Sequence, residues 1–214
     1  LAAVGAFDAA GEKNGTWLFY DKRGVLRRKD NHKNGIEAGP YVIYYPHGRR
    51  SDSLFLVDGQ ADGTILDFWK NGAPHFSKAK KDGEFNGPAK EYYRNGTLRY
   101  DYQLVNDKLD GPAKGYLPNG DLEYTMHFKE GLRDGLQLEF YRSGDTTGVE
   151  YFAEGKRTGV FRSYYDGGNL HESGRALEGV VVDTLRRYYV HGGLEDRLVF
   201  DSKGRKEGRQ INYS

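Results

Sequence analysis

A glycine recurs at every 24th residue along the chain. The series comprises Gly24, Gly48, Gly72, Gly96, Gly120, Gly144, Gly168 and Gly192. Four residues before each glycine stands an aromatic: Tyr20, Tyr44, Phe68, Tyr92, Tyr116, Phe140, Tyr164 and Tyr188. A fixed period of this length is typical of repeat arrays, in which each unit packs against its neighbours. The sequence therefore predicts one repeat domain over residues 1–214, with full repeats at about 15–206 and partial units at 1–14 and 207–214.

Two further glycine series predict the structure of each unit. A leading glycine recurs at Gly15, Gly39, Gly63, Gly87, Gly111, Gly135 and Gly159, and a third at Gly35, Gly59, Gly83, Gly131, Gly155 and Gly179. Asn-Gly pairs such as Asn71-Gly72 lie between apolar segments, which indicates hairpin turns with positive φ at both turn residues. The first unit then has strands near residues 16–21 and 25–32. The predicted fold is all-β: an elongated array of about eight antiparallel β-hairpins in a twisted single-layer meander sheet.

Apolar residues recur at two positions of the second strand, which predicts its core face. Leu26 and its equivalents Leu98, Leu122, Leu170 and Leu194 form one series. Leu56, Leu104, Phe128, Phe152 and Phe200 form the other, six residues later in the unit. Because side chains alternate between the faces of a strand, an even separation predicts that both series share one face.

Composition excludes several functional classes. The 32 basic and 31 acidic residues give a net charge of +1, whereas nucleic-acid-binding domains carry a clustered basic footprint. Basic pairs such as Arg186-Arg187 have acidic neighbours and are interpreted as solvated surface. The absence of cysteine excludes disulfides and Cys-based zinc sites.

No catalytic pattern is present in the sequence. It contains neither a phosphate-binding G-x-x-x-x-G-K-[ST] loop nor a G-x-S-x-G nucleophile elbow. The histidines that share a repeat position, His47 with His191 and His75 with His171, lie several units apart. We therefore expect no enzyme, no catalytic residues, no cofactor and no metal site.

An aromatic stripe is the main candidate for binding. The position after the recurrent aromatic carries Tyr45, Trp69, Tyr93, Tyr141, Tyr165 and Tyr189. One interpretation is that these rings only pack within the sheet. The other is a partly exposed Tyr/Trp stripe that contacts a ligand, since these residues are enriched in interface cores.

Several segments resemble the MORN-type repeat, in the variant found in bacteria. They are Gly87–Gly96 (GPAKEYYRNG), Gly135–Gly144 (GLQLEFYRSG) and Phe128–Gly135 (FKEGLRDG). The resemblance implies a stack of β-hairpins. Bacterial members often carry an antitoxin-like label, and others look like exported or lipid-anchored envelope proteins. Together with the start at Leu1, where Leu1–Ala6 fits either a signal-peptide remnant or a strand of an earlier repeat, this favours a location in the bacterial cell envelope, with a cytoplasmic location as the alternative.

Four functions are compatible with these observations. The leading hypothesis is a non-catalytic protein–protein interaction scaffold that presents a long repeat surface within a larger assembly, with another protein as the partner. Binding to a membrane surface or lipid, antitoxin-like neutralisation of a partner protein and carbohydrate binding through the aromatic stripe are the alternatives. Nucleic acid is not an expected partner.

Overall fold

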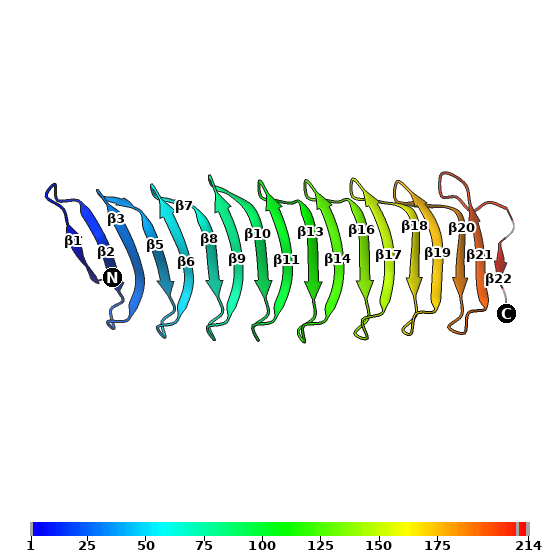
Figure 1. The fold of residues 1–214 in the computed structure, drawn as a ribbon, viewed down its shortest axis with the longest axis horizontal. Helices are drawn as coiled ribbons and strands as arrows, with labels where there is room; N and C mark the ends of the chain where they lie inside the picture. Colours follow the sequence, from blue (N-terminus) through cyan, green and yellow to red (C-terminus); the bar gives the residue numbers. More distant parts are fainter. Residues whose placement is uncertain (1, 209, 213–214) are drawn as a thin grey trace. The chain divides into compact units, whose positions relative to one another are not determined.

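The computed structural model describes residues 2–208 and 210–212, and its regular structure there consists of β-strands. It divides into two compact units, of which one ends at Lys108 and the other begins at Leu109. In each unit, consecutive strands pair antiparallel as hairpins in an open meander (Figure 1). The predicted all-β hairpin repeat is therefore confirmed. The division does not test the single-domain prediction, since repeats contact only their neighbours and an array can be divided between any two.

The first unit contains eleven strands before the division between the units. They are β1 (Ala2–Phe7), β2 (Lys13–Tyr20), β3 (Leu26–Lys33), β4 (Ile36–Glu37), β5 (Gly39–Tyr44), β6 (Arg50–Val57), β7 (Gln60–Ala61), β8 (Gly63–Phe68), β9 (Pro74–Lys81), β10 (Glu84–Tyr92) and β11 (Leu98–Val105). The two-residue strand β12 (Lys108–Leu109) contains the division itself.

The second unit continues the same pattern. Its strands are β13 (Gly111–Tyr116), β14 (Leu122–Lys129), β15 (Leu132–Arg133), β16 (Gly135–Phe140), β17 (Thr146–Ala153), β18 (Lys156–Tyr164), β19 (Leu170–Leu177), β20 (Val180–Tyr188), β21 (Leu194–Phe200) and β22 (Ile211–Asn212). Ile211 pairs with Arg197 as Val42 pairs with Lys29. This register places a one-residue insertion in the last, partial unit relative to the earlier repeats.

The 24-residue glycine series forms turns of a different type from the one predicted. In the Tyr45–Arg49 turn, the Tyr45 N–H donates to Arg49 O at 2.8 Å and the Gly48 N–H to Tyr45 O at 2.9 Å. Of each Asn-Gly pair in this series only the glycine has a positive φ, for example 92° at Gly72. The prediction of positive φ at both residues is therefore wrong here: the loop matches a type I turn followed by a left-handed glycine. The Asn71 carboxamide instead accepts the Ala73 N–H at 3.1 Å.

The third glycine series forms the tight two-residue turns at the opposite ends of the strands. Asn34 and Gly35 both have positive φ, 51° and 80°, between the paired residues Lys33 and Ile36. This is the backbone that a type I′ turn requires. The turn also contacts the preceding repeat, because the Gly35 N–H donates to Lys13 O at 2.9 Å. The same bond recurs from Gly155 to Arg133 O and from Gly179 to Arg157 O, so these glycines link successive repeats.

A β-bulge in each hairpin corrects the predicted core face. Phe19 pairs with Arg28 and Tyr20 pairs with Leu26, so Arg27 is the extra residue. Directly paired residues share a face, and Phe19 and Tyr20 point to opposite faces. Leu26 therefore lies on the face opposite Arg28, Asp30 and His32. The prediction that the two apolar series share one face is wrong, because a bulge between them reverses the alternation.

The two faces of each hairpin differ in burial. We call the face that carries the residue two positions after the leading glycine the closed face, and the other the open face. The closed-face residues Trp17, Ala89, Phe161 and Leu185 are buried. In the second unit, Phe161, Ala176 and Leu185 form a small core with Val181, Leu198 and Phe200 packed against it.

The backbone conformation of the tight turns can be tested with two glycines of the second unit. Gly179 has a φ of +90° and no atom within 4 Å of the point where a Cβ would lie, so Gly179→Ala adds only backbone strain. We expect a loss of about 1 kcal/mol in the free energy of unfolding, measured by urea denaturation. Gly148 lies in β17 without positive φ, and its nearest neighbour would be 3.9 Å from a Cβ. Gly148→Ala should therefore leave stability unchanged or raised; an equal loss in both variants would contradict this.

Candidate interaction surface

The aromatic stripe predicted from the sequence forms hydrogen bonds between repeats. All six residues are half-buried: Tyr45, Trp69, Tyr93, Tyr141, Tyr165 and Tyr189. Four of them donate to the carbonyl of the recurrent aromatic in the next repeat: Tyr45 to Phe68 (2.7 Å), Trp69 to Tyr92 (3.2 Å), Tyr141 to Tyr164 (2.9 Å) and Tyr165 to Tyr188 (2.9 Å). The polar atoms of these side chains are thus already engaged. Their role in ligand binding stays a prediction.

The stripe lies on the closed-face side of the hairpins, where histidines stack against it. Tyr165 and His171 have ring centroids 4.6 Å apart, and His171 Nδ1 lies 3.3 Å from Oγ of the closed-face residue Ser163. His47 stacks on Tyr45 and His191 on Tyr189, whereas the His75 ring is tilted against Trp69. Burial raises the pKa of Tyr45, and the nearby carboxylates Asp67 and Asp52 raise it further. The histidines at shared repeat positions therefore pack against the rings of the stripe.

A tyrosine pair of the second unit tests this structural role. Tyr165→Phe removes the hydroxyl that donates to Tyr188 O. We expect a loss of about 1 kcal/mol in the free energy of unfolding, as for a typical hydrogen bond. The matched control is Tyr151→Phe, because Tyr151 is 44% exposed on the open face. Thermal unfolding that shows the same shift for both variants would argue against the stripe as a link between repeats.

Two charged clusters on the closed face combine partners of opposite charge. In the first unit, Lys78 Nζ lies 3.0 Å from Glu91 Oε1, and the Tyr102 hydroxyl donates to the same oxygen at 2.7 Å. Burial acts to raise the pKa of Glu91, but the hydrogen bonds from Tyr102 and Lys78 outweigh it, so that pKa is lowered. In the second unit, Arg187 Nε lies 2.9 Å from Glu172 Oε2, and this bond raises the pKa of Arg187.

One closed-face cluster has residue types that bind metals. Asp30 is fully buried, and Arg28 Nε and His32 Nε2 lie 2.8 Å and 3.1 Å from its two oxygens. Asp30, His32 and Glu37 offer ligand atoms within 4.8 Å of one another, a set that suits a divalent transition metal. Sequence reasoning missed this cluster, although Asp30 and His32 stand where the next repeat has leucines. Because the Arg28 guanidinium already neutralises Asp30, we interpret the cluster as a buried ion pair with His32 hydrogen-bonded to it.

The open face of the second unit exposes a group of apolar side chains. Leu136 and Tyr151 are directly paired between β16 and β17, and they are 41% and 44% exposed. Val160 on β18 is 46% exposed. We call Leu136, Tyr151 and Val160 the apolar patch. Beside it, Leu138 pairs with Val149 on the same face.

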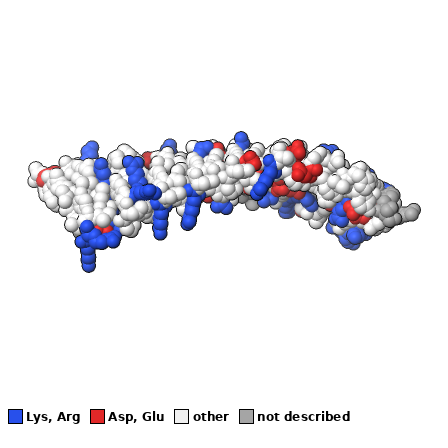
Figure 2. Space-filling view, turned by 90° about the horizontal axis from the view of Figure 1, so that it is seen from below, with Lys and Arg blue, Asp and Glu red and all other residues white. Residues whose placement is uncertain are grey.

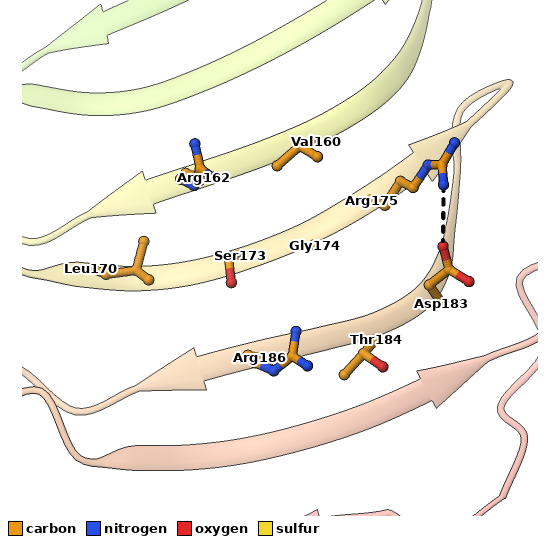
Figure 3. Close-up of a pocket in the computed structure, with 9 residues that line it drawn as sticks. All are labelled: Val160, Arg162, Leu170, Ser173, Gly174, Arg175, Asp183, Thr184 and Arg186. Atoms are coloured by element: carbon orange, nitrogen blue, oxygen red, sulfur yellow. Dashed lines mark ion pairs between the residues drawn. The ribbon is translucent and has the colours of Figure 1, made fainter.

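A row of arginines continues from this patch across four strands. Arg162 pairs with Ser173, Ser173 with Arg186, and Arg186 with Arg197, so the four side chains share the open face. Figure 3 shows Ser173 on β19 between Arg162 on β18 and Arg186 on β20. We call Arg162, Arg186 and Arg197 the arginine row. Within residues 2–208 and 210–212, none of the three forms an ion pair.

Two members of the arginine row, Arg162 and Arg186, line an open hollow of about 480 Å³. Val160 and Leu170 contribute apolar groups to its lining, and Ser173 and Thr184 contribute hydroxyls. At its rim Arg175 Nη1 lies 3.7 Å from Asp183 Oδ2, the ion pair drawn in Figure 3. Elsewhere, basic and acidic side chains are interspersed on the surface in view in Figure 2. The row is distinguished by the alignment of three arginines on one face of neighbouring strands.

The sequence alone does not distinguish the arginine row from other basic surface residues. Arg186 and Arg187 are adjacent, and the sequence alone favours one solvated cluster for both. The structure separates them, since Arg187 bonds Glu172 on the closed face whereas Arg186 lies on the open face.

Among the described residues no helix has the length and apolar character needed to cross a membrane.

Comparisons with known proteins identify the repeat. Residues 13–34, 85–106 and 109–130 match the MORN repeat variant family. No curated protein matches the chain. The crystal structure of TcdB2-TccC3 is similar at 13% identity and a TM-score of 0.27, over 98% of this chain but only 14% of that chain. A porin-like protein from Bacteroides uniformis ATCC 8492 is similar at 8% identity and a TM-score of 0.24, over 93% of this chain and 89% of that chain.

These structural similarities carry no argument about fold or function, since both TM-scores are low, and the chain spans about a seventh of the TcdB2-TccC3 chain. The family match is independent of them. Each of its three segments contains a hairpin with its glycine turn and ends at the first residue of the tight turn. Three segments of the chain therefore match the MORN repeat variant, and the remaining units continue their 24-residue pattern.

Proposed function

We propose that the protein is a non-catalytic scaffold that binds another protein through the open face of its second unit. The observation that carries this proposal is the apolar patch beside the arginine row. Leu136, Tyr151 and Val160 each expose more than two fifths of their surface on neighbouring strands. Exposed apolar groups next to arginines resemble interface cores, in which aromatic residues and arginine are enriched.

The aromatic stripe gives the carbohydrate alternative less support. Sugar binding combines ring stacking with free polar groups, but the donors of Tyr45, Trp69, Tyr141 and Tyr165 are bonded to backbone carbonyls. Neutralisation of a toxin would be a special case of the proposed binding. The same experiment would identify such a partner, whether it resides in the cell envelope or in the cytoplasm.

A matched pair of triple variants tests the proposal. Leu136→Thr, Tyr151→Thr and Val160→Thr remove the patch while keeping a residue type that favours strands. The control replaces three exposed valines outside the patch by threonine: Val57 and Val105 at the ends of β6 and β11, and Val190 in a turn. Tagged proteins with matching thermal unfolding are chemically crosslinked in native extract, and bound proteins are identified by mass spectrometry. We expect a stoichiometric partner that the patch variant loses and the control retains; a partner retained equally by both would contradict the proposal.

A further inference from the structure

The arginine row has a regular geometry that comes from the sheet. Neighbouring strands lie about 4.8 Å apart. Arg162 and Arg186 are two strands apart, and Arg197 is one strand further. The three guanidinium groups therefore start from points that span roughly 14 Å along a line perpendicular to the strands.

The charges in this row oppose one another. Arg186 and Arg197 are directly paired, and like charges in that arrangement destabilise a sheet. The nearby carboxylates Glu172 and Asp196 do not relieve this repulsion, because they lie on the closed face and contact Arg187. Asp183 contacts Arg175 instead. An anion that bridges the arginines would remove the repulsion and gain charge-assisted hydrogen bonds.

We propose that the arginine row binds an extended acidic segment of the partner protein. In an extended chain, side chains on one face recur about every 6.7 Å, so three alternate carboxylates span roughly 13 Å, close to the length of the row. Each carboxylate accepts paired hydrogen bonds from a guanidinium group. The hydroxyls of Ser173 and Thr184 line the hollow between the arginines and supply further donors.

The surroundings of the row select a polypeptide as the occupant. Val160 and Leu170 line the same hollow, and the apolar patch continues from it through Tyr151 to Leu136. A segment that combines acidic with apolar side chains complements both parts, whereas a free phosphate ion would contact the arginines alone. This inference rests on the proposed function and specifies the chemistry of the partner.

Fluorescence anisotropy of a synthetic peptide tests the inference without the native partner. The probe is a short labelled peptide with glutamate at alternate positions and valine or serine between them, and its neutral twin carries glutamine. The variant is Arg162→Gln with Arg186→Gln. The control, Lys114→Gln with Arg142→Gln, removes the same charge from exposed positions of the same unit, Lys114 standing at the repeat position of Arg162.

We expect the acidic peptide to bind the unaltered protein and to lose about tenfold in affinity for the arginine variant, with a smaller change for the control. Binding should also weaken as salt rises. Equal losses in both variants, equal binding of the neutral twin, no measurable binding, or full displacement by an equal charge concentration of inorganic phosphate would each overturn the inference. If the peptide fails while the apolar-patch variant still loses the native partner, only the inference fails; the proposed function fails if that variant retains its partner.

Discussion

Phe161→Ala should lower the free energy of unfolding by about 3–5 kcal/mol. Phe161 is 3% exposed and forms the core of the second unit with Ala176 and Leu185. The strand opposite accommodates the ring through Gly174, where an added Cβ would lie 2.5 Å from Phe161 Cζ. A smaller side chain leaves a cavity that Gly174 cannot fill, so the loss should approach the upper end of the range. Equilibrium denaturation in urea measures it.

The adjacent residue is a matched control for this prediction. Val160 points to the open face and is 46% exposed. Val160→Ala should therefore change stability by no more than about 0.5 kcal/mol. Similar losses at positions 160 and 161 would mean that the two faces of the second unit do not differ in burial as described.

Asp30→Asn should destabilise the first unit by about 3 kcal/mol. The substitution removes a fully buried charge and leaves the Arg28 guanidinium and the buried His32 ring without their carboxylate. This expected loss is at the lower end of the range for breaking a buried ion pair, because Arg28 is about one third exposed and can reach water. Urea denaturation is again the measurement. Asp62→Asn, at an exposed aspartate, is the control and should be nearly neutral.

A compensating variant separates a structural ion pair from a metal site. Asp30→Leu and His32→Leu place leucines where the next repeat has Leu54 and Leu56, and Arg28→Met removes the cation of the pair as well. Replacing both partners of a buried ion pair by packed apolar groups is often neutral or stabilising, so we expect this triple variant to recover most of the loss. If Zn²⁺ raised the melting temperature of the unaltered protein but not of Asp30→Asn, the cluster would be a metal site and the ion-pair interpretation would be wrong.

The periodicity predicted the hairpins because each repeat needs residues with positive φ at fixed positions. It did not predict the bulge at Arg27, since a bulge changes the register without changing the 24-residue period. The Asn71-Gly72 pair predicted a turn at the correct place but of the wrong type, because a left-handed glycine also suits a type I turn with a bulge. The type I′ backbone occurs at Asn34-Gly35 instead.

The candidate site was predicted less well than the fold. The stripe position was visible because it repeats, yet its hydrogen bonds to the next repeat depend on spatial neighbours 23 residues apart. The arginine row was not visible, because Arg162, Arg186 and Arg197 come from three different strands and align only through the strand pairing. The apolar patch depends on the same pairing.

Hydroxyl-radical footprinting of the complex with the captured partner tests the binding face most directly. The two candidate surfaces lie on opposite sides of the hairpins in the second unit, so the partner should protect one of them. We predict reduced oxidation of Leu136, Tyr151 and Val160, with Tyr141 and Tyr165 oxidised as in the free protein. Protection of Tyr141 and Tyr165 with unchanged oxidation of the apolar patch would contradict the assignment of the open face as the binding surface.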